Sequence, residues 1–178
     1  TDSISMLSRT GFFQLVRFLF SEPLKLKGDK TMSNNTSVII KFDFSAEQTV
    51  GQVTKAVGLV KQDNDFGIDV LDLKANPRSS KTGPVTAAIE DSIENDPSLF
   101  PFKTKGILLA SSRYERLERG RIRISPENFD IEGILDGGHN TLAIGLHILK
   151  KAMEYAGLSL PKGDKNWDLF KELWHENH

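Results

Sequence analysis

Five consecutive residues of types that are common in binding sites, Asp136 to Asn140, lie between an apolar segment and a helical pattern. They read Asp-Gly-Gly-His-Asn. The two glycines lack a Cβ, so they can take left-handed backbone angles and let a ligand approach the backbone closely. If a helix begins near Asn140 or Thr141, its free amides and its dipole form a site for an anion such as phosphate.

The side chains of this segment allow several roles. His139 could donate a hydrogen bond to phosphate, transfer a proton or pack in the core. Asp136 could hold a metal-bound water or activate a nucleophile, and Asn140 or Thr141 could cap the helix. A plain turn between a strand and a helix also needs glycine, so a ligand site and a structural turn both stay open. The segment is not a Walker A loop, because no Lys-Ser or Lys-Thr follows the glycines.

Hydrophobic periodicity indicates the elements that would position this segment. The helix interpretation of residues 45–62 depends on four valines at helical intervals and on Ser45 and Gln48 at the spacing of a capping box. Pro84 suits the first turn of another helix. Together the elements predict an α+β fold, a compact mixed sheet with helices around one layered core. Strands are predicted at residues 37–44, 68–74, 105–111, 120–126 and 130–136, and helices at residues 45–62, 84–96 and 141–155.

The two ends of the chain differ from its middle. The apolar segment Phe12–Phe20 is too short to span a bilayer and contains Arg17, so it predicts a packing helix. Trp167, Phe170 and Trp174 recur at helical intervals and predict a C-terminal helix. Because this helical pattern is still running where the sequence stops, the chain is interpreted as a fragment or one domain of a longer protein, with further domains or a second copy of the chain as expected partners. The expected parts are an N-terminal extension (1–36), a central domain (37–157) and a C-terminal helical segment (158–178).

Composition narrows the class of protein. The chain has a formal net charge of −1, 38% hydrophobic and 26% charged residues, and no cysteine. These values are typical of globular proteins and give no overall basic field for nucleic acid. The absence of cysteine excludes disulfides and thiolate catalysis and fits a cytoplasmic location. No apolar segment reaches the ~20 residues that a membrane-spanning helix needs, so no membrane partner is expected.

Two stretches resemble the ParB/sulfiredoxin-like superfamily. The segment ILDGGHNTLAIGLHILKKA (134–152) is similar to its strand–turn–helix motif, written roughly Asp-Gly-x-His-Arg and followed by an amphipathic helix. The segment 70–102, with Asn-Pro-Arg before a helix, resembles the loop and helix that precede this motif. Within the superfamily the chain looks most like the AIPR abortive-infection phage-resistance proteins, with the DndB regulators of DNA phosphorothioation as a near alternative. The similarity covers residues 70–157.

The resemblance implies a nucleotide site. In this superfamily the motif lies at a helix N-terminus and cradles nucleotide phosphates, while its members differ in chemistry. Some hydrolyse nucleoside triphosphates, some transfer phosphate, and some cut or bind DNA. Carried over to this chain, the resemblance marks one segment that would bind the phosphates. It also marks a loop facing that segment, whose arginine would neutralise phosphate charge. The phosphate-binding segment is Asp136, Gly137, Gly138 and His139, and the facing loop is Asn76, Pro77 and Arg78.

The chain departs from the motif at its last position. Asn140 replaces the usual arginine, so a triphosphate would depend more on backbone amides, on Arg78 and on a metal ion. The first hypothesis is a domain of an anti-phage defence protein that binds a nucleoside triphosphate with Mg²⁺, with hydrolysis as an open question. Asp136 would hold the metal or the water, His139 would act beside it as the second catalytic residue, and Asn140 and Thr141 would contact the nucleotide.

Two other hypotheses stay open. Arg119, Arg121 and Arg123 alternate with Gly120, Ile122 and Ile124, which predicts a strand with one basic and one apolar face. In a non-catalytic DNA-binding or regulatory module, the three arginines would contact phosphates along DNA. The remaining hypothesis is a scaffold domain in which Asp-Gly-Gly-His-Asn is only a turn.

Overall fold

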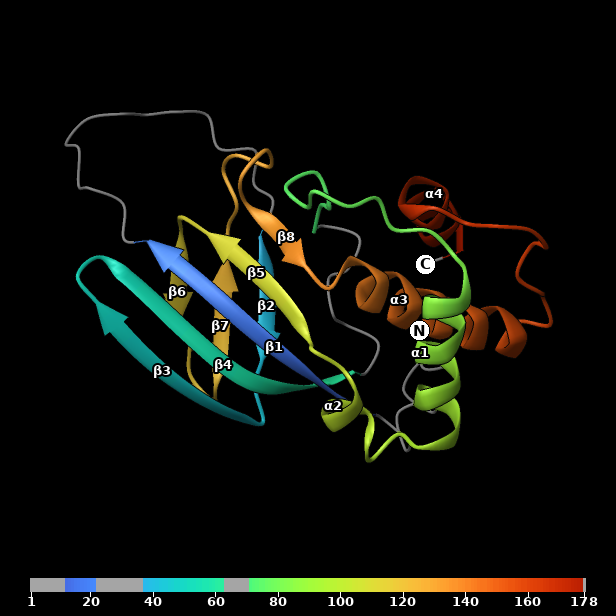
Figure 1. Cartoon of the computed structure of the whole chain (residues 1–178), viewed down its shortest axis with the longest axis horizontal. Coiled ribbons are helices and arrows are strands. Elements are labelled where there is room, and N and C mark those ends of the chain that lie inside the picture. Colours follow the sequence, from blue (N-terminus) through green and yellow to red (C-terminus); the bar gives the residue numbers. More distant parts are fainter. Residues whose placement is uncertain (1–11, 22–36, 63–70, 178) are drawn as a thin grey trace.

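The computed structural model describes residues 12–21, 37–62 and 71–177 of the chain. These residues form an α+β fold with two sheets and a group of helices at one end of them (Figure 1). The strands are β1 (Phe12–Ser21), β2 (Val38–Lys41), β3 (Phe44–Val50), β4 (Val53–Gln62), β5 (Ile107–Ser111), β6 (Tyr114–Arg116), β7 (Arg121–Ile124) and β8 (Gly133–Asp136). The helices are α1 (Pro84–Asn95), α2 (Phe100–Lys103), α3 (Gly138–Tyr155) and α4 (Trp167–Asn177).

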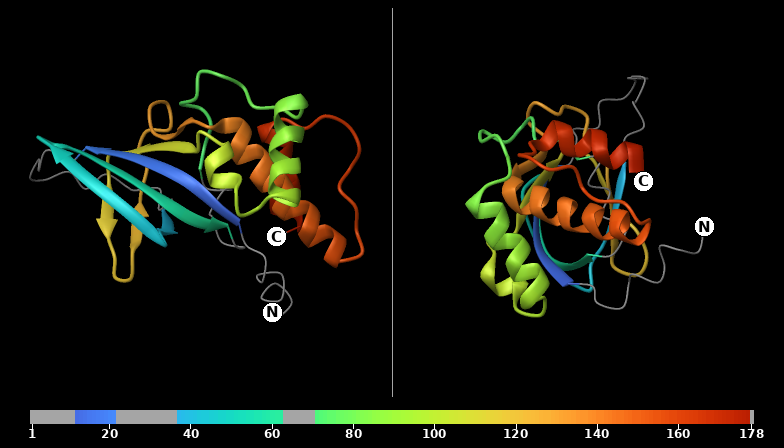
Figure 2. Two further views of the ribbon diagram at one scale, coloured as in Figure 1. Left: turned by 60° about the horizontal axis from the view of Figure 1, so that its bottom comes forward. Right: turned by 90° about the vertical axis from the view of Figure 1, so that its right-hand side faces the viewer.

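The larger sheet has the strand order β3-β4-β1-β5-β8, and the smaller one has the order β2-β7-β6. Only the β1–β5 pair among these strands is parallel; the other neighbours are antiparallel. The views in Figure 2 show the helices beyond the end of the sheets where β8 leads directly into α3. The junction between β8 and α3 is therefore the place where the sheet meets the helices.

The helix expected at Phe12–Phe20 is wrong, because these residues belong to strand β1. This strand lies between β4 and β5 and pairs with both of them. A short apolar run does not distinguish a buried helix from a central strand by its periodicity, and aromatic and β-branched residues favour the strand.

The helix expected at residues 45–62 is also wrong. Strands β3 and β4 form an antiparallel hairpin in which Val50 is paired with Val53 across a two-residue turn. Gly51 in that turn has a φ of 61°, which suits the tight turns of hairpins. The hydroxyls of Thr49 and Thr54 lie 2.9 Å apart across the strands. Valine and threonine are stiff at χ1 and favour strands, so residue type outweighs the helical spacing here.

Only part of the strand expected at residues 68–74 lies within the described residues, and residues 71–74 are not a strand. Leu71 and Leu73 are nevertheless buried, and the carbonyl of Asp72 accepts a hydrogen bond from the amide of Ile134 (3.0 Å). This segment therefore runs beside β8 and leads into the loop at residues 76–80.

Several expected elements are confirmed. Helix α1 begins at Pro84 and β5 lies within residues 105–111, while β7 and β8 fall within the predicted strands 120–126 and 130–136. Helix α3 ends at Tyr155 as expected, but it begins at Gly138, earlier than Thr141. The C-terminal helix is present as α4, and its three predicted apolar residues are buried: Trp167, Phe170 and Trp174.

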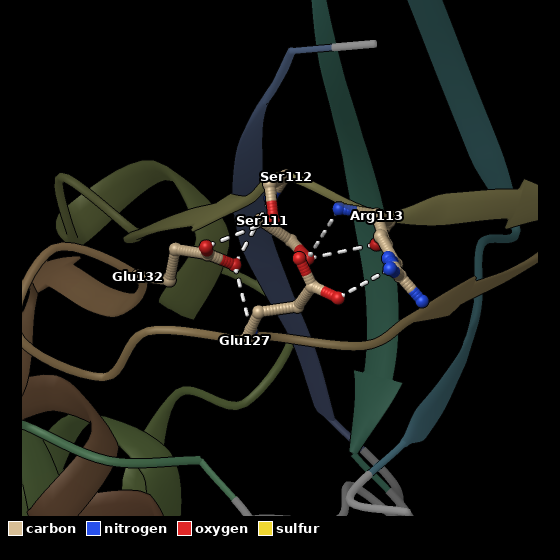
Figure 3. A network of polar contacts seen from close by, with 5 residues as sticks. All are labelled: Ser111, Ser112, Arg113, Glu127 and Glu132. Atoms are coloured by element: carbon tan, nitrogen blue, oxygen red, sulfur yellow. Dashed lines mark hydrogen bonds and ion pairs between the residues drawn. The ribbon is translucent and has the colours of Figure 1, made fainter. Parts of the chain in front are cut away.

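A buried carboxylate connects the end of β5 to the segment that precedes β8 (Figure 3). The side chain of Glu132, which is 6% exposed, accepts hydrogen bonds from the Ser112 amide (3.0 Å), the Ser112 hydroxyl (2.9 Å) and the Glu127 amide (3.1 Å). Beside it, the Arg113 guanidinium and the Glu127 carboxylate form an ion pair of 2.6 Å. Because β8 begins at the residue after Glu132, this network holds the strand that leads into the β8–α3 junction.

Replacing Glu132 with glutamine should lower the free energy of unfolding by about 2 kcal/mol, because an amide nitrogen cannot accept the hydrogen bonds that the carboxylate accepts. For a chain of this length, that corresponds to a fall in Tm of roughly 4–8 °C in a thermal melt. The matched control is Glu127→Gln, which removes only a solvent-exposed ion pair and should change stability by less than about 1 kcal/mol. Equal effects of the two substitutions would contradict the role given to Glu132.

Candidate functional site: a pocket at the start of helix α3

A pocket of about 570 Å³ lies where β8 meets α3. Its lining comes from four parts of the chain: the loop at residues 76–80, one side of α1 from Pro84 to Ser92, the segment from α2 to the start of β5, and the turn at residues 136–140. The structure therefore brings the Asp-Gly-Gly-His-Asn segment and the Asn-Pro-Arg loop into one pocket, although they are about sixty residues apart in the sequence.

Gly137 caps helix α3, and its position requires glycine. Its φ is 85°, a backbone angle that residues with a side chain rarely adopt. A Cβ here would also lie 2.4 Å from the carbonyl oxygen of Gly106 and 2.9 Å from Cα of Ile107. The Asp136 carboxylate accepts a hydrogen bond from the Gly137 amide (2.8 Å). The first glycine thus lets the start of the helix pack directly against the start of β5.

The second glycine, Gly138, lets the facing loop approach the helix. A Cβ at this position would lie 2.3 Å from Oγ of Ser80 and 3.0 Å from Nδ2 of Asn76. The Asn76 carbonyl oxygen Oδ1 accepts a hydrogen bond from the Arg78 amide (3.0 Å), which shapes the loop. Close packing therefore explains both glycines, and the second one lets polar groups of the loop lie at the start of the helix.

Free backbone donors open into this pocket. The first intrahelical hydrogen bond of α3 runs from the Thr141 amide to the Gly137 carbonyl (2.9 Å). The amides of Gly138, His139 and Asn140 precede that bond, so they point beyond the helix start, as the first amides of any helix do. All three residues line the pocket. This geometry is suited to an anion.

The expectation that Asn140 or Thr141 caps the helix is wrong, because the helix begins earlier and Gly137 is the cap. Thr141 is fully buried, donates a hydrogen bond to the Gly137 carbonyl (3.0 Å) and does not line the pocket. The Asn140 amide group donates to Thr104 Oγ1 (2.5 Å) and to the Gly106 carbonyl (3.1 Å). Asn140 thus joins α3 to the segment before β5, and Thr141 receives no ligand contact in our assignment.

The charged groups of the pocket favour an anionic ligand. Three cationic side chains line it, those of Arg78, Lys103 and Lys105, against the single carboxylate of Asp136. Lys103 also forms an ion pair of 2.5 Å with Asp96, which lies outside the lining. Arg78 and Lys105 are exposed, as is Asp136. A pocket with this excess of positive charge attracts negatively charged ligands.

Sequence reasoning missed five polar residues of this pocket: Ser80, Ser92, Lys103, Thr104 and Lys105. Ser80 follows Asn76 and Arg78 in a polar loop, and Lys105 directly precedes a predicted strand. The sequence shows polar residues in a loop and before a strand, but no local pattern indicates that these distant segments converge in the fold. The signal that could have found them is their proximity to the two motif segments.

A magnesium ion fits the donors present only together with a phosphorylated ligand. Among the described residues, no group of three or more His, Asp or Glu side chains could hold a metal ion. Asp136 supplies one carboxylate at the pocket. Magnesium is often bound by one or two carboxylates together with substrate phosphates. One carboxylate from Asp136 fits this mode of binding, and its role as a metal ligand stays a prediction.

Part of the positive charge of the predicted basic strand is neutralised by a neighbouring carboxylate. Arg119 lies in the turn between β6 and β7 with a φ of 61°, and only Arg121 and Arg123 lie in β7. Arg123 forms an ion pair of 2.6 Å with Glu115, and Arg121 donates to the Glu118 carbonyl (3.1 Å). The strand belongs to the smaller sheet, away from α1 and α3 (Figure 1). Contact of these arginines with DNA stays a prediction.

Two further observations bear on the class of protein. No helix among the described residues is long and apolar enough to cross a membrane. Comparison of the chain with protein families, curated proteins and solved structures finds no match.

Proposed function

We propose that this chain is a ParB/sulfiredoxin-like domain that binds a nucleoside triphosphate with Mg²⁺ in the pocket at the start of α3. One observation carries the proposal: the free amides of Gly138, His139 and Asn140 open into the same pocket as Arg78 and Lys105. Helix amides and cationic side chains together are the usual means of binding phosphate groups.

The residues of the pocket have distinct roles in this proposal. The α3 amides hold phosphate oxygens, and His139 donates a further hydrogen bond from the same helix turn. Arg78 and Lys105 approach from two other segments and neutralise the charge of the polyphosphate. Asp136 lies at the pocket as the ligand for Mg²⁺, which when bound would neutralise phosphate oxygens. For hydrolysis, Asp136 or His139 would accept a proton from water.

The motifs supply the biological part of the proposal. The two segments that resemble the ParB/sulfiredoxin-like superfamily line one pocket. Their similarity to AIPR proteins supports a role in anti-phage defence, in which nucleotide binding controls a harmful output. A DNA-binding or regulatory module is the second candidate, and a DNA arm in the same experiment tests it.

Nucleoside triphosphate should stabilise the chain against thermal unfolding. A ligand at about 100 times its Kd adds about 2.7 kcal/mol, which raises the Tm of a chain of this length by roughly 5–11 °C. The measurement compares ATP, GTP and CTP with a non-specific DNA duplex, each with and without Mg²⁺. A shift with at least one nucleotide that is larger with Mg²⁺ is expected.

Two charge reversals make this experiment specific to the pocket. Arg78→Glu should weaken nucleotide binding roughly tenfold or more, because it replaces a phosphate partner with a like charge. Lys162→Glu changes the net charge by the same amount at an exposed residue outside the pocket and should leave the shift unchanged. No shift with any nucleotide would refute the proposal, and a shift with DNA alone would favour the regulatory module.

A further inference from the structure

Ser80 is a buried polar residue whose hydroxyl has no protein partner among the described residues. Its side chain is 3% exposed, and Oγ makes no hydrogen bond there. Buried hydroxyls are nearly always hydrogen-bonded, because an unsatisfied one loses its interaction with water without replacement. An unsatisfied hydroxyl that borders a pocket is explained most simply by a ligand that completes its hydrogen bond.

The hydroxyl of Ser80 lies at the start of helix α3. It would be 2.3 Å from a Cβ built on Gly138, and Ser80 lines the same pocket as the free amides. Asn76 adds a second side-chain donor, because its Oδ1 accepts the Arg78 amide while its Nδ2 lies toward Gly138. Donors from the loop and from the helix thus converge on one small region, as they do around a single tetrahedral phosphoryl group.

Helix α1, in contrast to these polar donors, lines the pocket with apolar side chains. Val85 and Ala88 line the pocket and are exposed, with Val85 58% exposed, while Ile89 beside them is half-buried. The apolar residues of this helix are thus divided: Ile93 packs in the core, and the N-terminal part forms an apolar wall of the pocket. Exposed apolar side chains in a concave site favour the uncharged body of a ligand.

We infer that Ser80 and the α3 amides bind one phosphoryl group, and that the uncharged nucleoside part of the ligand lies along Val85, Ala88 and Ile89 of α1. This inference rests on the proposed function and adds to it a binding residue and an orientation. It makes the pocket a site for phosphorylated molecules that carry an apolar or aromatic body, rather than for small anions alone.

Isothermal titration of the full chain with ATP and with inorganic pyrophosphate separates the two halves of the inference. Ser80→Ala should weaken the binding of both probes roughly tenfold, because both lose a hydroxyl donor to a charged oxygen. Without ligand, the Tm of this variant should not fall, since the substitution removes an unsatisfied group. A hydroxyl with a purely structural role would instead give a lower Tm and unchanged binding.

Ala88→Gln tests the apolar wall without adding charge. It should weaken ATP binding several-fold or more and leave pyrophosphate binding unchanged, because the longer polar side chain occupies the place of the nucleoside. Ala87→Gln is the matched control, since Ala87 is an exposed residue of the same helix that does not line the pocket. Its binding of both probes should equal that of the unmodified chain.

The outcomes distinguish the inference from the proposed function. Unchanged binding of both probes by Ser80→Ala would overturn the phosphoryl subsite. Unchanged ATP binding by Ala88→Gln, or an equal loss for both probes, would overturn the orientation. If the unmodified chain binds pyrophosphate but none of ATP, GTP and CTP, the proposed function fails while the Ser80 subsite is still supported by its effect on pyrophosphate. Binding of neither pyrophosphate nor any of the three nucleotides overturns both.

Discussion

Gly137→Ala should lower the free energy of unfolding by about 3 kcal/mol, because it combines left-handed strain of roughly 1–2 kcal/mol with overpacking of similar size. The overpacking arises because the new Cβ would lie 2.4 Å from the Gly106 carbonyl oxygen, a backbone atom that cannot rotate away. The expected fall in Tm is roughly 6–12 °C, and denaturant unfolding checks the free energy directly. The nucleotide-dependent shift should decrease as well, because relief of the clash moves the start of α3.

The control for this substitution is Gly157→Ala. Gly157 also has a left-handed φ, 74°, but a Cβ there would meet no atom within 4 Å. Only the backbone strain remains, so a loss of about 1 kcal/mol and a fall in Tm of roughly 2–4 °C are expected. If both variants lost the same stability, the close approach of Gly137 to β5 would contribute nothing to the effect of Gly137→Ala.

The junction between β8 and α3 could be predicted from the sequence because its main elements are local. Glycines after an apolar segment and before a helical pattern indicate a tight junction with exposed amides, and α3 begins there. The start of the helix was misplaced because Asn140 and Thr141 are good capping residues by type. Gly137 is the cap instead, with a left-handed φ, and a Cβ at this position would meet the backbone at the start of β5.

The residues that complete the pocket could not be predicted, because they depend on contacts between distant segments. Nothing near Ser80 in the sequence indicates that its hydroxyl lies against Gly138. The β3–β4 hairpin shows the same limit in another form. Its valines fit a helical period, but they favour strands by type, and β4 pairs both with β3 and with β1, which lies in an apolar segment interpreted as a helix.

Phe170→Ala should lower the free energy of unfolding by about 3–5 kcal/mol, the usual effect of removing a fully buried aromatic ring. Phe170 is 0% exposed, and its ring centroid lies 5.1 Å from that of Trp167 and 5.6 Å from that of Trp174. The ring also fills the space over Gly145 of α3, where a Cβ would lie 2.5 Å from it. A fall in Tm of roughly 6–20 °C is expected in a thermal melt.

Leu169→Ala is the control on the same helix, because Leu169 is 37% exposed and its truncation should lower stability by about 1 kcal/mol or less. Helix α4 contributes no residue to the pocket. Nucleotide should therefore raise the Tm of Phe170→Ala as much as it raises the Tm of the unmodified chain. Gly137→Ala and Phe170→Ala both reduce stability, but only Gly137→Ala should reduce the response to nucleotide. Loss of that response in Phe170→Ala would show that the site depends on how α4 holds α3, and not only on the junction between β8 and α3.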